Sequence, residues 1–528
     1  MRVLFASAEV YPLVKTGGLA DVSAALPHAL REIGVDVQII VPAYPSVLSS
    51  AADKMIVAEL SEDGVYPTRL IKARMPDSGL PIWLVDSPIH FDRGGTPYRN
   101  EQGDDWPDNA VRFGWFSRVA AKLAVGELVP GWCADVVHAN DWHTGLLPVL
   151  LRDQRPATVF TIHNLAYQGR FPRSVLQELG LSPSLFALDG IEFYGDISFL
   201  KAGIQFADAI TTVSPSYARE IITPEFGCGL DGLLRYRFKQ LRGILNGVDY
   251  NVWNPAIDSY LASPFDLEDL SGKSLCKADL QRELKLDVEP DVPLIVWLSR
   301  ITDQKMADVV AYTLHRIFDR DVQLAILGDG DAALEEKFQE AVEHYPGQLA
   351  VRIGYQEAQA HRYLGGADLL LHPARFEPCG LTPLYAMRYG VLPIVRHVGG
   401  LSDTIVDATE WTVPGGTASG FAFRESTADG MLDCLDRALA YYGDRDRWEG
   451  LQRRAMSREF GWTASAQRYL ALYRTVAPKV ADIEPVRCET PVVLMTGATR
   501  EVTSAPAVAN RRTKRWFSHA GPSIVRTA

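Results

Sequence analysis

Short, β-rich apolar runs alternate with helix-like segments along most of this chain. In the first part of the sequence the apolar runs are 3–6, 37–41, 82–85, 135–138, 158–162 and 209–213. The alternation restarts after a loop-rich, proline-containing segment (246–291), with further runs at 294–298, 323–327, 368–371 and 392–395. Alternating strands and helices predict βαβ units, so we expect an α/β fold with two doubly wound parallel sheets.

The length of the chain supports more than one domain. With 528 residues it exceeds what one ordinary core accommodates, and we place a hinge near residue 250. The expected domains are 1–250 and 251–477. Beyond Ala477 the rhythm stops, and the segment 478–528 is rich in Pro, Ala, Thr and Arg, which predicts a disordered tail. The alternative is a partner contact through its basic cluster, 511–517.

Composition narrows the function classes. The chain is 47% hydrophobic, and no apolar run approaches the ~20 residues of a membrane span, so we expect no membrane partner. The apolar start is short and is interrupted by Glu9, which argues against a signal peptide and for a cytoplasmic location. Six cysteines lack paired or metal-ligand spacing, as expected for reduced thiols. A net charge of −12 argues against a nucleic-acid partner.

A loop with paired glycines follows the first apolar run. It reads Lys15-Thr16-Gly17-Gly18-Leu19-Ala20-Asp21, and a helix is expected to begin near Leu19. Backbone N–H groups and the positive end of that helix would point to one place, an arrangement that binds anions. Lys15 adds a mobile positive charge, whereas Asp21 offers an acceptor suited to hydroxyl groups. The loop therefore predicts a phosphorylated, hydroxyl-rich ligand.

Two strand ends in the second half carry similar chemistry. Arg300 and Lys305 follow the run 294–298 and could clamp one diphosphate, the alternative being a solvated surface pair. After the run 368–371, Thr382 is expected to cap a helix with a proline at its first position, giving a second anion cradle at 380–382. Glu377 beside it would address sugar hydroxyls or, alternatively, pair with Arg375.

Polar residues also end two strands of the first half. His138, Asp141 and His143 are metal-ligand types, but their spacing matches no metal motif, so we expect no metal. His163 and the asparagine after it could bind or polarise a sugar, the alternative being a core or loop histidine. The segment 246–249, Asn-Gly-Val-Asp, is typical of a turn.

Together these segments resemble bacterial glycogen synthase and plant starch synthase. The resemblance rests on 15–21, 163–169, 245–249, Arg300 with Lys305, and 377–382. The order and spacing of these segments agree with those of the family over residues 1–477. It implies the GT-B architecture, in which two Rossmann-like domains face a deep cleft, with the acceptor on the N-terminal side and the nucleotide sugar on the C-terminal side. It further implies transfer of glucose from ADP-glucose to the non-reducing end of an α-1,4-glucan such as glycogen, with retention of configuration, release of ADP and no metal or organic cofactor.

The resemblance also implies roles for single residues. Arg300 and Lys305 would neutralise the leaving diphosphate, since preorganised cations stabilise charge that develops in the transition state. Glu377, His163 and Asn246 would hold the transferred glucose, with Asp141 near the reacting sugar. The other substrate contacts would be Lys15 and Gly18 at the donor, Asp21 in the same loop, Tyr355 at adenine, Cys379, Gly380, Leu381 and Thr382 at the phosphates, and Tyr98 on the acceptor side.

Retention of configuration often uses two carboxylates, one of them a nucleophile. No such pair is evident in the sequence, and the family resemblance instead implies that the acceptor hydroxyl attacks on the face from which the nucleotide leaves. Three positions depart from the family pattern: Met306 where glycine is common, Pro383 in place of a polar residue, and His397 where a second arginine is common. None of them removes a residue that is assigned to the chemistry.

Three other functions are compatible with parts of this pattern. The donor could be another nucleotide sugar, such as UDP-glucose. A glucan-binding relative without activity is a second possibility, suggested by Met306. A dinucleotide-dependent dehydrogenase would use the same type of sheet, but the first strand is not followed by Gly-x-Gly-x-x-Gly.

Overall fold

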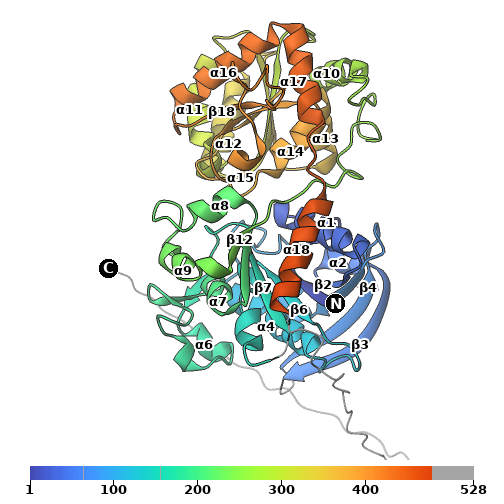
Figure 1. The fold of residues 1–528 in the computed structure, drawn as a ribbon, viewed down its shortest axis with the longest axis vertical. Coiled ribbons are helices and arrows are strands. Elements are labelled where there is room, and N and C mark those ends of the chain that lie inside the picture. Colours follow the sequence, from blue (N-terminus) through green and yellow to red (C-terminus); the bar gives the residue numbers. More distant parts are fainter. Residues whose placement is uncertain (63–64, 155, 478–528) are drawn as a thin grey trace, which may run out of the picture. The chain divides into compact units, whose positions relative to one another are not determined.

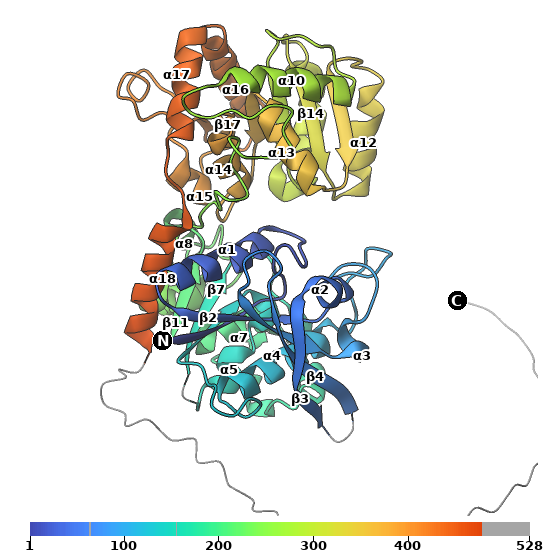
Figure 2. The same cartoon turned by 90° about the vertical axis from the view of Figure 1, so that its right-hand side faces the viewer.

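The computed structural model describes residues 1–62, 65–154 and 156–477, which form two α/β sheets with their covering helices (Figures 1 and 2). The predicted tail, 478–528, lies outside the described residues. Within the described part of the chain, no helix is both long and apolar enough to cross a membrane.

The first sheet has nine strands. Its order is β12 (Leu241–Gly243), β11 (Ala209–Thr212), β7 (Ala157–Ile162), β6 (Val136–Asn140), β1 (Arg2–Ala6), β2 (Asp36–Pro42), β5 (Pro81–Asp86), β4 (Val65–Arg74) and β3 (Ala52–Glu62). The seven strands from β12 to β5 run parallel; the parallel arrangement and six of these strands were predicted, whereas β12 was not. The edge hairpin β3–β4 is antiparallel and was not predicted, so the sheet is mixed.

Alternate residues of the central strands face two separate cores, as a parallel sheet covered on both sides requires. Leu4 and Ala6 of β1 pack with α4, α5 and α7 on one face, whereas Val3 and Phe5 pack with α1 and α18 on the other. The helices of this part are α1 (Gly18–Glu32), α2 (Pro45–Ser50), α3 (Pro88–Phe91), α4 (Asn109–Ala124), α5 (Leu147–Leu151), α6 (Val175–Glu178), α7 (Phe199–Phe206), α8 (Pro215–Glu220) and α9 (Asp231–Tyr236). A small antiparallel sheet of β8 (Arg170–Pro172), β10 (Asp196–Ser198) and β9 (Glu192–Phe193) joins them.

The second sheet is fully parallel. Its six strands lie in the order β15 (Leu349–Ile353), β14 (Gln323–Gly328), β13 (Leu294–Leu298), β16 (Leu369–His372), β17 (Leu392–Arg396) and β18 (Phe421–Phe423). Counted along the chain, this is the 3-2-1-4-5-6 order of the doubly wound fold. In Figure 1, α11 (Ala307–Ile317) and α12 (Ala332–Val342) lie on one side, and α13 (Glu357–Gly366), α14 (Leu381–Arg388) and α17 (Arg445–Met456) on the other. The remaining helices are α10 (Ser271–Leu284), α15 (Gly399–Thr404) and α16 (Ala428–Tyr442).

The last described helix, α18 (Trp462–Val476), packs on the first sheet. Trp462, Ala466, Tyr469 and Tyr473 are buried with residues of α1 and the central strands, and Figures 1 and 2 show α18 beside α1. The predicted division at residue 250 placed this segment in the second domain. The chain therefore crosses between the sheets twice, and the crossings meet where the Val248 N–H donates to the carbonyl of Phe460 at 2.8 Å.

Candidate active site

Several of the predicted site residues lie at the two places where strand order reverses. In doubly wound sheets ligands bind at such switch points, beyond the carboxyl ends of the strands. In the second sheet the reversal lies between β13 and β16, which are followed by Lys305 and Glu377, respectively. In the first sheet it lies between β1 and β6, which are followed by Lys15 and Asp141.

Lys305 and Glu377 form a buried ion pair. Lys305 ends a 3-10 turn, η4 (Asp303–Lys305), and its Nζ donates to Oε2 of Glu377. The two side chains are 11% and 9% exposed. Nε2 of His372, the last residue of β16, lies 3.1 Å from the same oxygen. Although burial opposes ionisation, Lys305 and His372 lower the pKa of Glu377 to about 2, so the carboxylate is charged at neutral pH.

The loop that carries Glu377 is held on both sides. Arg375 donates to both carboxylate oxygens of Asp308 at 2.8 Å, so the alternative pairing of Arg375 with Glu377 is wrong. The carbonyl of Glu377 accepts the N–H of Gly400 at 3.0 Å. A Cβ atom at Gly399 would lie 1.9 Å from that carbonyl oxygen, so only glycine fits under this loop.

Helix α14 starts directly after this loop. Gly380 precedes the helix in a left-handed conformation (φ 84°, ψ 66°) that favours glycine, and the helix begins at Leu381. Thr382 is therefore the second helical residue, and its predicted role as the cap is wrong. The first-turn N–H groups still give this end a partial positive charge. A Cβ at Gly18, the first residue of α1, would lie 3.1 Å from Cδ1 of Leu381, so these two predicted site residues adjoin.

Met306, next to Lys305, adopts a backbone conformation that is unusual for its type. Its φ and ψ are 54° and 33°, in the left-handed region, and its side chain is fully buried in the core of the second sheet. Left-handed backbone costs a residue other than glycine ~1–2 kcal/mol. The buried thioether offsets this cost, which explains how a methionine occupies a position where the family pattern has glycine.

We expect Met306→Gly to destabilise the protein by ~1–3 kcal/mol. Glycine removes the strain, but the lost burial and the cavity of a methionine cost ~2–5 kcal/mol, and glycine adds backbone entropy to the unfolded chain. Lys285→Gly is the matched control, because Lys285 has the same conformation (φ 59°, ψ 32°) with an exposed side chain. That control should be neutral or slightly stabilising. A higher melting temperature for Met306→Gly would contradict the argument.

The glycine loop after β1 is tied down by a carboxylate that sequence analysis missed as a site residue. Oε2 of the buried Glu9 accepts the N–H groups of Thr16 and Gly17, the latter at 3.2 Å. These N–H groups are therefore already bound within the protein, which differs from the expected open cradle. The other oxygen of Glu9 accepts the hydroxyl of Tyr98, whose ring stacks on His143 at 4.5 Å between centroids. Glu9 thus links the loop of Lys15 to the predicted acceptor-side tyrosine.

Asp141 and His163 meet at the ends of β6 and β7. The N–H of His163 donates to Oδ1 of Asp141 at 2.8 Å, and Nε2 of His163 lies 3.0 Å from Oδ1 of Asn140. Burial lowers the pKa of His163 to about 3, so the imidazole is neutral. Burial also raises the pKa of Asp141 to about 7, against the hydrogen bonds of two backbone N–H groups. Asp141 has φ 56° and ψ −179°, a strained backbone of the kind found at functional sites.

The other predicted residues have specific surroundings. Asn246 is buried, and its Oδ1 has no hydrogen-bond partner among the described residues. Burial raises the pKa of Cys379 to about 12, although hydrogen bonds from Asn246 oppose the rise. The guanidinium of Arg300 donates to the hydroxyl of Tyr167 at 2.6 Å, a partner that sequence analysis did not assign to the site. The unpaired, buried Oδ1 of Asn246 is suited to accept a hydrogen bond from a ligand hydroxyl.

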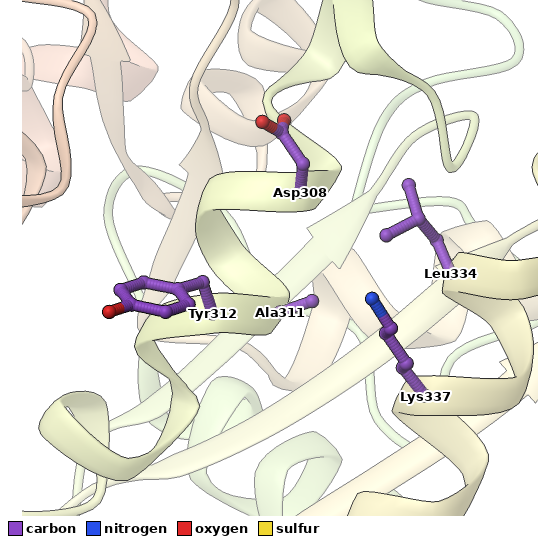
Figure 3. A pocket seen from close by; sticks show the side chains of 5 residues that line it. All are labelled: Asp308, Ala311, Tyr312, Leu334 and Lys337. Atoms are coloured by element: carbon purple, nitrogen blue, oxygen red, sulfur yellow. The ribbon is translucent and has the colours of Figure 1, made fainter.

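Two features lie outside this constellation. Nδ1 of His138 lies 2.7 Å from the Tyr473 hydroxyl, and its Nε2 lies 2.6 Å from Oγ1 of Thr161. His138 is therefore a core histidine. Among residues 1–62, 65–154 and 156–477, no group of three His, Cys, Asp or Glu side chains is placed to hold a metal ion. A hollow of about 420 Å³ between α11 and α12 is lined by Asp308, Ala311, Tyr312, Leu334 and Lys337, none of which was predicted for the site (Figure 3).

Comparison with known proteins shows the class of protein to which the chain belongs. The family described as "Glycosyl transferases group 1" matches residues 292–428, the part with the second sheet. A sucrose-phosphate synthase from Thermosynechococcus elongatus shares the fold at a TM-score of 0.56 and 17% identity, covering 90% of this chain and 98% of that one. The chain is thus a glycosyltransferase with the GT-B fold.

The family follows from closer relatives. The "Starch synthase catalytic domain" family matches residues 2–236. Glycogen synthases of Paramagnetospirillum magneticum and Thioalkalivibrio sulfidiphilus are 49% and 48% identical, over 90% of this chain and 98% and 99% of theirs. The catalytic domain of starch synthase IV from Arabidopsis thaliana, solved with ADP and acarbose, has a TM-score of 0.83 at 32% identity, covering 90% of this chain and 99% of that one. This chain belongs to the glycogen synthase and starch synthase family.

Proposed function

We propose that this protein transfers glucose from ADP-glucose to the non-reducing end of an α-1,4-glucan, with retention of configuration and release of ADP. The observation that carries this proposal is the buried Lys305–Glu377 pair at the switch point, next to the N-terminus of α14. A cation and a helix start suit a leaving diphosphate, and a carboxylate suits sugar hydroxyls. The names of the relatives and the ADP held by the plant enzyme agree with this donor.

In the proposed reaction, the bond between C1 of glucose and the phosphate oxygen breaks as a bond from C1 to the acceptor oxygen forms. Both events take place on one face of the sugar, and the acceptor proton passes to the departing diphosphate. Lys305 and Arg300 stabilise the charge that develops on this leaving group. The neutral His163 and the unpaired Oδ1 of Asn246 hold glucose hydroxyls, with Glu377 as the charged acceptor.

The test is turnover by the purified full chain. With ADP-glucose and glycogen we expect release of ADP and lengthening of the outer glucan chains, and a slower reaction with UDP-glucose. Faster turnover with UDP-glucose would show that UDP-glucose is the preferred donor. Binding of glycogen without turnover of either nucleotide sugar would show a glucan-binding relative and overturn the proposed activity.

A further inference from the structure

One glutamate that sequence analysis did not single out joins two residues predicted to hold the donor. Glu357 is the first residue of α13, and its Oε2 accepts from Nζ of Lys15 at 3.0 Å and from the hydroxyl of Tyr355 at 2.6 Å. Lys15 follows β1 and Tyr355 follows β15, so one carboxylate oxygen connects loops of both sheets. We propose that Glu357 is a positioning residue of the donor site, which fixes Lys15 and Tyr355 relative to each other. This inference rests on the proposed function.

The charges around Lys15 favour positioning over simple attraction of an anion. Its Nζ also lies 2.9 Å from Oδ1 of Asp21, so one ammonium faces two carboxylates. Burial raises the pKa of Asp21 to about 6, and His361 and Lys15 lower that of Glu357 to about 2 against the effect of burial. Both acids are therefore largely ionised at neutral pH, and negative charge exceeds positive charge in this cluster. A lysine whose charge is neutralised by two carboxylates attracts a diphosphate weakly. Lys15 would therefore act mainly through the direction of its N–H donors.

The second oxygen of Glu357 is backed by a rigid group. Oε1 lies 3.9 Å from Nε2 of His361, and neither atom has a hydrogen-bond partner among the described residues. Nδ1 of His361 lies 2.7 Å from Oδ2 of Asp258, and Trp253 stacks on the imidazole at 4.0 Å between centroids. The helix start adds a favourable field for a carboxylate in the first turn of α13. The orientation of Glu357 is thus set by the two hydrogen bonds of Oε2, with His361 facing its other oxygen.

The geometry predicts a selective effect on the donor. If Lys15 and Tyr355 address different parts of a nucleotide sugar, a fixed distance between them preorganises both contacts. Loss of the Glu357 charge weakens the hydrogen bond from Lys15. Of its two ion pairs, Lys15 then keeps only the one with Asp21, which lies on α1. Binding of the donor should then weaken, whereas binding of the glucan should not change, because no acceptor-side residue contacts Glu357 among the described residues.

The experiment compares Glu357→Gln with Glu335→Gln in the full chain. Glu335 is in the first turn of α12, so its replacement removes the same helix-end charge away from Lys15. In Glu357→Gln we expect the KM for ADP-glucose and the Kd for ADP to rise about tenfold, with the KM for glycogen within about twofold. In Glu335→Gln both should stay at the wild-type values. In the cycle with Tyr355→Phe, the two effects on ADP affinity should be less than additive.

The outcomes separate this inference from the proposed activity. A purely structural Glu357 would lower the melting temperature and the active fraction but leave both KM values unchanged. Unchanged donor KM and ADP affinity in folded Glu357→Gln would overturn the inference while the wild-type activity stands. If the wild type binds ADP without turnover, the proposed activity fails and ADP titration of the variants still decides the role of Glu357. If the wild type does not bind ADP, both proposals fall.

Discussion

In Lys305→Ala we expect kcat to fall about 10²–10³-fold, with little change in the KM for the donor. The ammonium that pairs with Glu377 is preorganised next to the first turn of α14, where the charge of a leaving diphosphate would develop. A contact that strengthens in the transition state changes kcat more than substrate binding. Single-turnover and steady-state rates with ADP-glucose measure this effect.

The same substitution should destabilise the fold, because it leaves Glu377 buried without its cation. Breaking a buried pair on one side typically costs ~3–5 kcal/mol. The double variant Lys305→Met with Glu377→Gln removes both charges, so it should recover most of the stability and none of the activity. Recovery of activity in the double variant would contradict the role of these groups in catalysis.

A second buried pair provides the matched control. Nζ of Lys277 lies 2.7 Å from Oδ2 of Asp368, with side-chain exposures of 7% and 12%, close to those of the Lys305–Glu377 pair. Asp368 directly precedes β16, so this pair sits at the opposite end of the strand from Glu377. Lys277→Met should lower the melting temperature to a similar extent, yet kcat per folded molecule should stay near that of the wild type.

The pH dependence of stability should separate wild type and Lys305→Ala. In the wild type the pKa of Glu377 is lowered from 4.5 to about 2, so its stabilisation is complete above the unfolded value and is lost as the pH falls toward 2. In the variant, burial favours a proton on Glu377, and the carboxylate that has lost Lys305 favours a proton on the adjacent His372; either proton neutralises the site. The difference in melting temperature should therefore widen from about pH 5 to about pH 8. A constant difference would contradict this account.

The polar residues at the strand ends were predictable from sequence. Buried β-rich runs indicate parallel strands, and the residues that follow such strands must lie at one edge of the sheet. Lys15, Arg300, Lys305 and Glu377 were found in this way. His372 carried a weaker signal as the last residue of its strand. Glu9 and Glu357 carried none. Glu9 binds N–H groups 7 and 8 positions away, and Glu357 joins Tyr355, 2 positions away, to Lys15, 342 positions away, so both sets of contacts depend on how the loops pack.

Local signals also reached their limit at caps and edges. Thr382 has the right chemistry for a cap, but the helix is preceded by the left-handed Gly380 and begins at Leu381, two residues earlier than a Thr382 cap allows. The hairpin β3–β4 gave no buried apolar run, since it forms the edge of the first sheet, where Met55 and Ile56 are exposed. For α18, the spacing of Trp462, Ala466, Tyr469 and Tyr473 shows an apolar stripe, but a stripe does not say which sheet it covers.

The attachment of α18 to the first sheet predicts a large loss of stability when it is weakened. The Tyr473 ring is fully buried, and its hydroxyl lies 2.7 Å from Nδ1 of His138. Tyr473→Ala removes a large buried side chain and leaves a buried imidazole nitrogen unpaired, so we expect a loss of ~3–5 kcal/mol. Tyr473→Phe removes only the hydroxyl and should cost ~1–2 kcal/mol. Tyr363→Phe is the control, because the buried Tyr363 hydroxyl has no partner among the described residues and its loss should be neutral or stabilising.

The loss should also reach the candidate site. His138 precedes Asp141 by three positions, and Thr161, its other partner, precedes His163 by two. Loosening α18 therefore loosens the strands that hold Asp141 and His163. In Tyr473→Ala, hydrogen exchange should accelerate in β6 and β7 and remain unchanged in β13 and β16. We expect kcat to decrease as the amides of β6 lose their protection from exchange. Faster exchange confined to the second sheet would show that α18 stabilises that sheet instead, contrary to the packing of Tyr473.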